Sequence, residues 1–303
     1  MRSRGGVFLW RVEDLDPPRV VPGMAAAQRE DLAWLGLDWD EGPYVQSERS
    51  ALYEEALARL AAAGPLFPCR RSRKDLQAMA SAPHGRDGGA PYPAAFRPPH
   101  LEPGWYERLR GAGRPDAALR FRVDERPVLW SDRVVDDGNA RSERLDETVG
   151  DFVLKRRDGL YAYQLAVVVD DLAMGIDDVV RGADLLDSTA RQIRLIEALG
   201  GTPPAYAHVP LVVDAQGEKL SKRDQGLTLR SLREAGVAAE TLAGWLAWSL
   251  GLLERPEPCP PADLVPLFAW ERIRREEVRL PQDPAAFSRA LSPARTIPPD
   301  GAA

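Results

Sequence analysis

The sequence predicts an α/β fold with a largely parallel sheet, and two observations support this prediction. Continuous apolar runs, which are the pattern of buried parallel strands, occur at residues 165–169 and 209–213. Segments with helical periodicity lie between and before these runs. Strands that alternate with helices are typical of α/β domains, so one such domain is expected.

The N-terminal part predicts one strand and two helices. Residues 7–12 are expected to form a short buried strand, followed by a charged loop. A helix is expected from Met24, with Gly36 as its end. Ser50 is expected to cap a second helix, which ends at Gly64.

The middle of the chain predicts loops, a strand and a further helix. Residues 81–103 are rich in Pro, Gly and Ala, as loops are. Residues 119–123 alternate like a half-buried strand. A helix capped by Ser188 or Thr189 is expected to run to Gly200.

The composition excludes several classes of protein. A net charge of −6 argues against a general polyanion-binding protein, which usually carries a basic balance. Two cysteines give no disulfide framework and predict a reducing compartment. The N-terminal apolar run is too short for a signal peptide, and the apolar stretch at 242–253 is too short to span a bilayer. We therefore expect a cytoplasmic protein with no membrane partner.

The segment 217–223 is the most informative short motif. It carries Lys219 and Lys222 three positions apart, with Ser221 between them. On a loop after a strand, such lysines can close over a triphosphate and neutralise its oxygens as pyrophosphate leaves. A basic surface turn is the alternative, and the segment taken alone favours that alternative.

Two further segments suggest binding of a charged small molecule. Alternate carboxylates at 13–16 follow the first strand, where Glu13 can bind an ammonium group; a charged turn with local ion pairs is the alternative. Tyr163 is expected at the start of the strand 165–169, and Arg181 at the end of the next strand. Both can line one pocket in which Arg181 binds a carboxylate, although a core tyrosine and an ordinary ion pair also fit.

The order and spacing of these segments resemble the glutamyl-tRNA synthetase group. Residues 220–223 are similar to its KMSKS loop, and the phrases at 12–19, 163–171 and 181–189 resemble its glutamyl-queuosine tRNA(Asp) synthetase branch. The resemblance extends from about residue 5 to residue 253. It implies a Rossmann-like class I synthetase catalytic domain with an inserted small α+β subdomain and a short helical C-terminal part.

We place the boundaries of these parts from the same resemblance. The catalytic domain is expected at residues 1–64 and 148–240, and the inserted subdomain at 65–147. A helical part with a Pro-rich tail is expected at 241–303.

The resemblance also implies a reaction and its substrates. ATP, with Mg²⁺, would activate L-glutamate to glutamyl-adenylate, and the glutamyl group would pass to the queuosine base of tRNA(Asp). Glu13 would hold the amino group of glutamate, while Tyr163 and Arg181 would line the pocket for its side-chain carboxylate. Lys222 would bind the ATP phosphates, and Lys219 and Ser221 would complete the catalytic loop.

The sequence departs from the family pattern in two places. The ATP-cradling His-x-Gly motif of the family is missing, and we expect it upstream of Met1, so that the chain as written is truncated and inactive. Many members hold zinc with three cysteines and a tyrosine. Cys69 and Tyr92 match two of these positions, whereas Arg71 and Phe96 occupy the others. One thiolate and one phenol cannot form a tetrahedral zinc site, so zinc is not expected.

Two alternative interpretations remain open at this point. A fragment of a glutamyl-tRNA synthetase would carry a long anticodon-binding region after the lysine loop, but only 80 residues follow Arg223 (303 − 223). This shortness favours the queuosine-modifying branch. The missing motif favours a non-catalytic tRNA- or glutamate-binding remnant. We expect a monomer.

Overall fold

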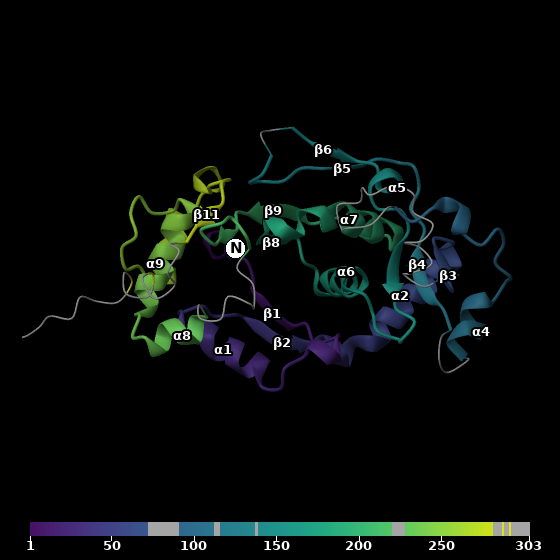
Figure 1. Cartoon of the computed structure of the whole chain (residues 1–303), viewed down its shortest axis with the longest axis horizontal. Coiled ribbons are helices and arrows are strands. Elements are labelled where there is room, and N and C mark those ends of the chain that lie inside the picture. Colours follow the sequence, from purple (N-terminus) through teal and green to yellow (C-terminus); the bar gives the residue numbers. More distant parts are fainter. Residues whose placement is uncertain are drawn as a thin grey trace, which may run out of the picture. The chain divides into compact units, whose positions relative to one another are not determined.

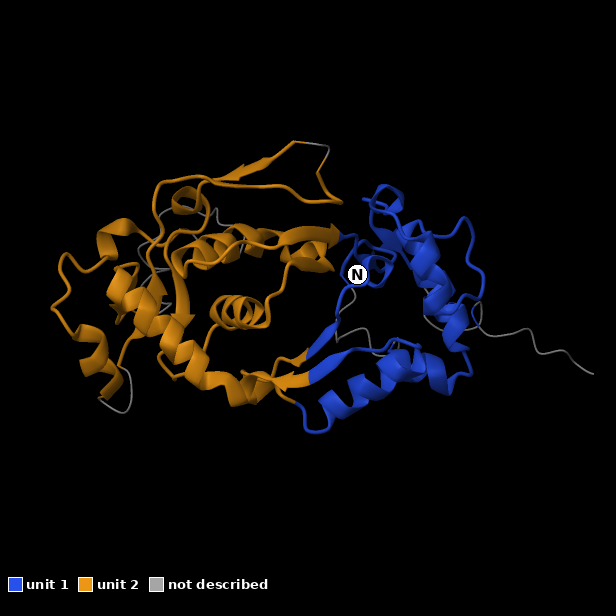
Figure 2. Cartoon of the chain, turned by 180° about the vertical axis from the view of Figure 1, so that it is seen from behind, with its two compact units in different colours: residues 1–10, 21–42, 209–303 blue, residues 11–20, 43–208 orange. Residues whose placement is uncertain are grey.

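The chain forms two compact units, each described here by itself. The computed structural model describes residues 1–71, 91–111, 116–136, 139–219 and 228–280, together with 287 and 291. Unit 1 comprises residues 1–10, 21–42 and 209–303, and unit 2 comprises residues 11–20 and 43–208 (Figure 2). Strands β1 (Leu9–Val12) and β2 (Glu41–Val45) form a two-stranded sheet, and each of these strands contains residues of both units.

Unit 2 contains a three-stranded antiparallel sheet in the order β3–β4–β7. Its strands are β3 (Leu66–Cys69), β4 (Ala118–Phe121) and β7 (Phe152–Lys155). Phe121 lies opposite Leu66 on one side and Phe152 on the other. All three side chains are buried, so this row stabilises the sheet through the apolar area removed from water.

Helix α6 (Tyr163–Met174) lies between helices α2 (Ser50–Ala63) and α7 (Thr189–Ala198), as Figure 1 shows. The prediction of a strand at 165–169 was therefore wrong. Each of residues 165–170 is buried, because α6 packs against neighbours on several sides. A helix that is apolar all round shows no periodicity that separates it from a buried strand. Gly175, in the left-handed conformation at φ 65°, ends it.

The predicted ends of the other helices agree well with the structure. Helix α1 (Met24–Trp34) begins at the expected residue. Helix α2 begins at Ser50 and ends at Gly64, whose φ of 97° is left-handed; Arg49 occupies the N-cap position instead of Ser50. Helix α7 follows Ser188, although no side-chain hydrogen bond caps it.

The described part of unit 2 also contains short strand pairs and two small helices. Strand β5 (Val128–Trp130) pairs with β6 (Arg141–Glu143) in antiparallel fashion, and β8 (Asp178–Gly182) pairs with β9 (Ala205–Val209). In the sequence, helix α4 (Trp105–Gly111) precedes the pair β5–β6, and helix α5 (Leu145–Thr148) follows it.

Unit 1 has its own apolar core. Strands β10 (Val212–Val213) and β11 (Val278–Arg279) pair in parallel fashion. The described helices of this unit are α1, α8 (Leu229–Glu234), α9 (Ala239–Leu250) and α10 (Pro261–Leu264). Trp245 of α9 contacts Phe287 edge to face at 4.9 Å. The strand expected at 209–213 is divided into β9 and β10, since Pro210 has no N–H to donate.

The expected single, largely parallel sheet is not what the described strands form. They make five separate sheets of two or three strands, and the largest is antiparallel. One reason is that residues 165–169, which were expected to supply a central strand, belong to α6. The α/β content itself agrees with the prediction.

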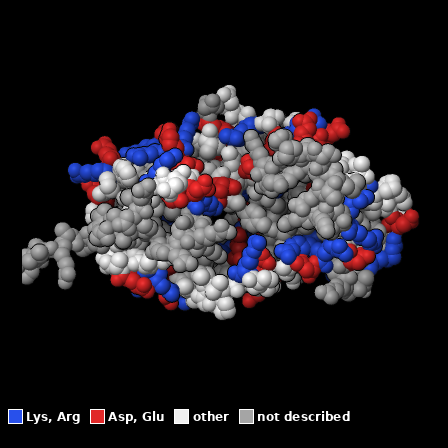
Figure 3. Space-filling view, viewed as in Figure 1, with Lys and Arg blue, Asp and Glu red and all other residues white. Residues whose placement is uncertain are grey.

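Two further features are the length of the apolar helices and the distribution of charged side chains on the surface. No helix within the described ranges is long and apolar enough to cross a membrane. On the face shown in Figure 3, Lys and Arg side chains lie among Asp and Glu side chains over much of the described surface.

Candidate functional site

The three residues expected to bind glutamate come together within unit 2. Glu13 follows β1, Tyr163 begins α6, and Arg181 lies in β8. Burial raises the pKa of the Tyr163 hydroxyl, the charge of Arg181 opposes this rise, and the charge of Glu13 adds to it. Tyr163 is thus the first residue of a helix rather than of a strand, yet it lies near both expected partners.

Arg181 is held by three side chains, none of which is a carboxylate. Its Nε donates to His208 Nε2 at 2.9 Å, Nη1 to Gln192 Oε1 at 2.7 Å, and Nη2 to Thr189 Oγ1 at 2.9 Å. The guanidinium also lies over the ring of Tyr206, 5.5 Å from its centroid. The three hydrogen bonds fix the orientation of the guanidinium. Within the described residues no carboxylate forms an ion pair with Arg181, so its charge is available for an anion.

The acidic side of the site is organised by Arg11. Its Nη2 donates to Glu13 Oε1 at 3.2 Å and its Nη1 to Asp171 Oδ1 at 2.6 Å. Glu13 stays 44% exposed, whereas burial raises the pKa of Asp171, with Arg11 acting against the rise and Glu13 adding to it. Two carboxylates that share one arginine retain acceptor capacity for an ammonium group.

A buried network under the site holds α6 in place. Asp170 is fully buried and accepts hydrogen bonds from Gln46 Nε2 at 2.9 Å, Tyr53 Oη at 2.9 Å and Arg49 Nε at 2.6 Å. The three donors come from α2 and from the turn before it. The next residue of α6, Asp171, pairs with Arg11.

Sequence reasoning missed several residues of this arrangement. Arg11, Thr189, Gln192, His208 and Asp132 were not expected at the site, although all of them contact a site residue or its direct neighbour. Thr189 and Gln192 come 8 and 11 residues after Arg181 in the sequence, and both lie in the first turn of α7. That spacing was visible in the sequence, whereas the long-range contact with Asp132 was not.

The lysine loop lies mostly outside the described residues. Lys219 pairs with Val213 in an antiparallel bridge, and a tight turn at Asp214 connects them. Asp214 Oδ1 accepts the backbone N–H groups of Gln216 and Glu218, at 2.9 and 2.8 Å. Ser221 and Lys222 are not among the described residues.

The four positions of the family zinc site form a small aromatic cluster. Cys69 Sγ lies 3.4 Å from Tyr92 Oη, which donates to the carbonyl oxygen of Phe96 at 3.2 Å. The guanidinium of Arg71 lies 4.3 Å from the centroid of the Phe96 ring, and that of Arg120 lies 4.3 Å from the Tyr92 ring. In the described part of the chain, no three His, Cys, Asp or Glu residues are placed to hold a metal ion.

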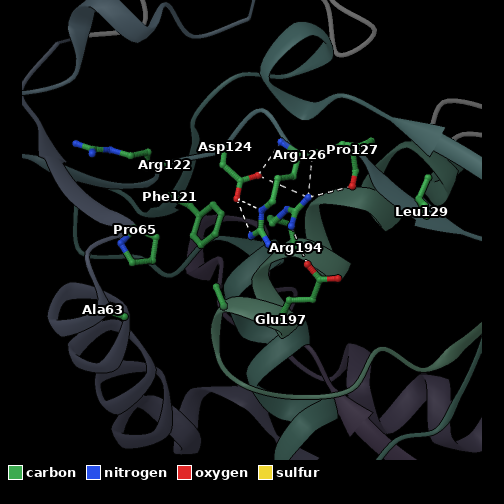
Figure 4. A pocket seen from close by; sticks show the side chains of 11 residues that line it. Ala63, Pro65, Phe121, Arg122, Asp124, Arg126, Pro127, Leu129, Arg194 and Glu197 are labelled. Atoms are coloured by element: carbon green, nitrogen blue, oxygen red, sulfur yellow. Dashed lines mark hydrogen bonds and ion pairs between the residues drawn. The ribbon is translucent and has the colours of Figure 1, made fainter.

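A pocket of about 600 Å³ in unit 2 is lined by other residues (Figure 4). Arg194, only 6% exposed, donates to Glu197 Oε2 at 2.9 Å and to the carbonyl oxygen of Arg126 at 2.7 Å. Asp124 lies 3.6 Å from Arg194 and also pairs with Arg126. The charges at this pocket are therefore largely satisfied by one another, unlike that of Arg181.

Comparison with known proteins defines the family. Residues 1–249 match the family described as tRNA synthetases class I (E and Q), catalytic domain. The chain belongs to this family of class I aminoacyl-tRNA synthetases, and it is a ligase of that type.

Three similar curated proteins carry the same name. A glutamyl-Q tRNA(Asp) synthetase of Symbiobacterium thermophilum is 46% identical over 94% of this chain and 89% of its own length. Proteins of the same name from Nitratidesulfovibrio vulgaris and Geobacter sulfurreducens are 44% and 49% identical, over 93% and 77% of this chain and 88% and 70% of their own lengths.

Solved structures support the fold. A glutamate tRNA ligase from Elizabethkingia meningosepticum, in complex with its amino acid, is similar with a TM-score of 0.77 and 25% identity. A glutamate-tRNA synthetase from Elizabethkingia anophelis gives the same TM-score at 26% identity. Each match covers 95% of this chain but only 63% and 64% of the solved chain. The predicted Rossmann-like class I synthetase fold is confirmed.

Proposed function

We propose that the protein activates L-glutamate with ATP and transfers it to the queuosine base of tRNA(Asp). In the first step, the α-carboxylate of glutamate attacks the α-phosphorus of ATP, and pyrophosphate leaves. In the second step, a hydroxyl group of the queuosine base attacks the carbonyl carbon of glutamyl-adenylate, and AMP leaves.

The observation that carries this proposal is the position of Arg181. The guanidinium is held by three acceptors that are not carboxylates, so its charge in this partly buried site suits a carboxylate ligand. Glu13 and Asp171 supply negative charge near Tyr163, where an ammonium group would be neutralised. Glutamate carries both kinds of charge, with its side-chain carboxylate directed to Arg181 and its amino group to Glu13.

The choice of acceptor is supported by the relatives. The curated proteins that align along most of their own length are named for tRNA(Asp) and the Q nucleoside, whereas the similar glutamate tRNA ligases are longer. ATP would be bound with Mg²⁺ by the segment that contains Lys222. We further propose a cytoplasmic monomer.

The amino acid site is tested with the full-length gene product by glutamate-dependent pyrophosphate exchange. Arg181→Leu should lose about 30-fold to several-thousand-fold in kcat/KM for glutamate, because truncating one partner of a buried charge pair costs about 2–5 kcal/mol. Arg126→Leu is the matched control, since Arg126 is 73% exposed and pairs with Asp124. Exchange within about threefold of the parent for Arg181→Leu would refute the carboxylate assignment.

The acceptor is tested by transfer of labelled glutamate. We expect transfer to tRNA(Asp) that contains queuosine and no transfer to the same tRNA without queuosine. Charging of tRNA(Glu) instead would favour a glutamyl-tRNA synthetase. Exchange without transfer to either tRNA would contradict the second step only, and absence of both activities would favour the binding remnant.

A further inference from the structure

The acceptor that holds Arg181 Nε is itself held by a buried carboxylate. His208 lies in β9, and its Nδ1 is 2.6 Å from Asp132 Oδ2. Both side chains are fully buried. Asp132 Oδ1 accepts the backbone N–H group of His208 at 3.1 Å, so one carboxylate holds this residue at two points.

Asp132 is fixed as a carboxylate. Its Oδ1 also accepts the backbone N–H groups of Val134 and Val135, at 2.9 and 3.0 Å. Burial alone would raise the pKa of Asp132, but the hydrogen bonds from His208 and from three backbone N–H groups outweigh it, and the pKa lies well below its usual value. An ionised carboxylate only accepts hydrogen bonds, so Nδ1 of His208 carries a proton.

The tautomer of His208 follows from its two partners. Arg181 has only donors, so the ring nitrogen that faces its Nε–H must offer a lone pair. Nδ1–H donates to Asp132 and Nε2 accepts from Arg181, which defines a neutral imidazole of one tautomer. Thr189 Oγ1, 3.3 Å from Nε2, fits as a second donor to it while accepting from Arg181.

This arrangement fixes the plane of the Arg181 guanidinium. Its Nε, Nη1 and Nη2 each make one hydrogen bond, and these use three of the five N–H groups of an arginine. The other two N–H groups make no hydrogen bond to the described residues, and they can bind a ligand. Rotation about the Cδ–Nε bond would carry Nη1 and Nη2 away from Gln192 and Thr189 and turn the Nε–H away from His208, so the three bonds together hold the plane.

We propose that Asp132 and His208 are positioning residues for amino acid binding, acting as a relay in which Asp132 sets the tautomer of His208 and His208 orients Arg181 toward the substrate carboxylate. The proposal rests on the proposed role of Arg181 in binding glutamate. Asp132 follows β5, within the stretch 65–147 that the sequence predicts as an insertion. The relay therefore ties that stretch to the amino acid site.

Asp132→Asn is the decisive variant. Its Oδ1 can still accept the three backbone N–H groups, which leaves its NH₂ group facing Nδ1 of His208. Nδ1 must then accept, the ring proton moves to Nε2, and two donors face each other at Arg181. We expect KM for glutamate to rise by about tenfold or more, the effect of one hydrogen bond to a charged group. KM for ATP and kcat should stay within about threefold of the parent.

The tautomer can be observed without any activity. The chain has three histidines, so ¹⁵N NMR of the ring nitrogens is simple to interpret, and His208→Gln identifies the signals of His208. At about pH 8, where a free imidazole is neutral, the parent should show the proton on Nδ1 and Asp132→Asn should show it on Nε2.

A double-mutant cycle separates the relay from a general loss of structure. In His208→Gln, an amide oxygen near the Nε2 position can accept from Arg181, and no tautomer exists to be changed. Asp132→Asn should therefore raise KM for glutamate much less in this background than in the parent. Asp151→Asn is the matched control, because Asp151 is also fully buried, binds Arg97 and accepts a backbone N–H group.

The outcomes distinguish the relay from the proposed function. Suppose that Arg181→Leu loses glutamate activation as expected. The relay is then overturned if Asp132→Asn leaves the tautomer of His208 unchanged, or if it leaves KM for glutamate unchanged. Equal losses for glutamate and ATP, or the same loss in Asp151→Asn, would also overturn it. If Arg181→Leu retains normal glutamate kinetics, the carboxylate assignment fails and the relay loses its role in binding.

Discussion

Arg11 Nη1 lies 2.6 Å from Asp171 Oδ1, and this ion pair joins the end of β1 to helix α6. Arg11 is only 15% exposed and Asp171 only 17%. The same guanidinium lies 3.8 Å from the fully buried Asp170 and 3.2 Å from Glu13. Arg11 is thus the cation that allows three carboxylates to lie close together at the base of the site.

Arg11→Met should destabilise the protein strongly. Removing one partner of a buried ion pair leaves the other charge without compensation, at a cost on the order of 3 kcal/mol. Arg19→Met is the matched control on the same segment, because Arg19 is 85% exposed and pairs with Asp16 at 3.3 Å. Its effect should stay below about 1 kcal/mol, as for exposed ion pairs. Urea unfolding at pH 7 measures both, and equal losses would show that the Arg11 pair is not special.

The loss in Arg11→Met should also depend on pH. The pKa of Asp171 is raised by burial even in the presence of Arg11, so the native state favours the protonated form more than the unfolded state does. Stability from such a group is fully present below its unfolded pKa of about 4 and is lost as pH rises through the higher native value. Without Arg11 the native pKa should rise further. The variant should therefore be closer to the parent at pH 5 than at pH 7, and a constant difference would contradict this assignment.

Gly150 should tolerate no side chain. Its φ of 68° is left-handed, and a Cβ atom there would lie 2.3 Å from the backbone nitrogen of Tyr92 and 2.7 Å from its carbonyl oxygen. Gly159 is the matched control, with φ 90° and no atom within 4 Å of the added Cβ. Gly159→Ala should cost about 1–2 kcal/mol from backbone strain alone. Gly150→Ala should cost about 1–3 kcal/mol more through overpacking, measured by urea unfolding. Equal costs would show that the chain near Tyr92 shifts freely.

Local signals in the sequence predicted the helices that have clear ends. Helix α2 combines one apolar face, containing Tyr53, Leu57 and Leu60, with a terminal glycine, and its limits followed from these features. Helix α6 lacks such a face, since neighbours cover it on several sides, and its apolar run was interpreted as a strand. The spacing of apolar residues identifies a helix when only one of its faces is buried. It does not distinguish a helix from a strand when the element is buried on all sides.

The site was predicted only in part, for a similar reason. Glu13, Tyr163 and Arg181 belong to phrases that resemble a known family, so they could be named, and the structure brings them together. Their roles stay predictions, as do the domain boundaries. Asp132 and His208 are 76 positions apart, and no local pattern links a buried aspartate in a loop to a histidine in a distant strand. Such pairs become visible only in three dimensions.

Lys222, outside the described residues, is predicted to act on the leaving pyrophosphate. A lysine that meets charge developing in the transition state lowers the barrier rather than binding the ground state. Lys222→Ala should therefore reduce kcat of pyrophosphate exchange by about 100-fold or more, with a smaller change in KM for ATP. Lys219→Ala, on the strand-paired side of the loop, should show a smaller loss. A change in KM alone would mean that Lys222 only helps ATP to dock.

The aromatic cluster at the family zinc position should hold this part of the chain without metal. Cys69 and Tyr92 are buried together, and Phe67 lies against Tyr92 with ring centroids 6.0 Å apart. The pKa of Tyr92 is raised by burial first and by the hydrogen bond with Cys69, so a phenolate ligand is disfavoured there. Arg71 lies against the Phe96 ring, where a cation near a metal ion would repel it.

Metal analysis and one substitution test this prediction together. Purified protein should contain far less than one zinc per chain, and a chelator should leave its Tm unchanged, because no binding free energy is lost. Cys69→Ala should remove only a small buried side chain and cost about 1–2 kcal/mol, as for a modest core truncation. Phe67→Ala in the same cluster is the comparison and should cost about 3–5 kcal/mol, since far more apolar volume is lost. Retention of about one zinc per chain after dialysis would show that a metal site exists and that its remaining ligands lie elsewhere in the chain. The same conclusion would follow if Cys69→Ala released metal and cost as much stability as Phe67→Ala.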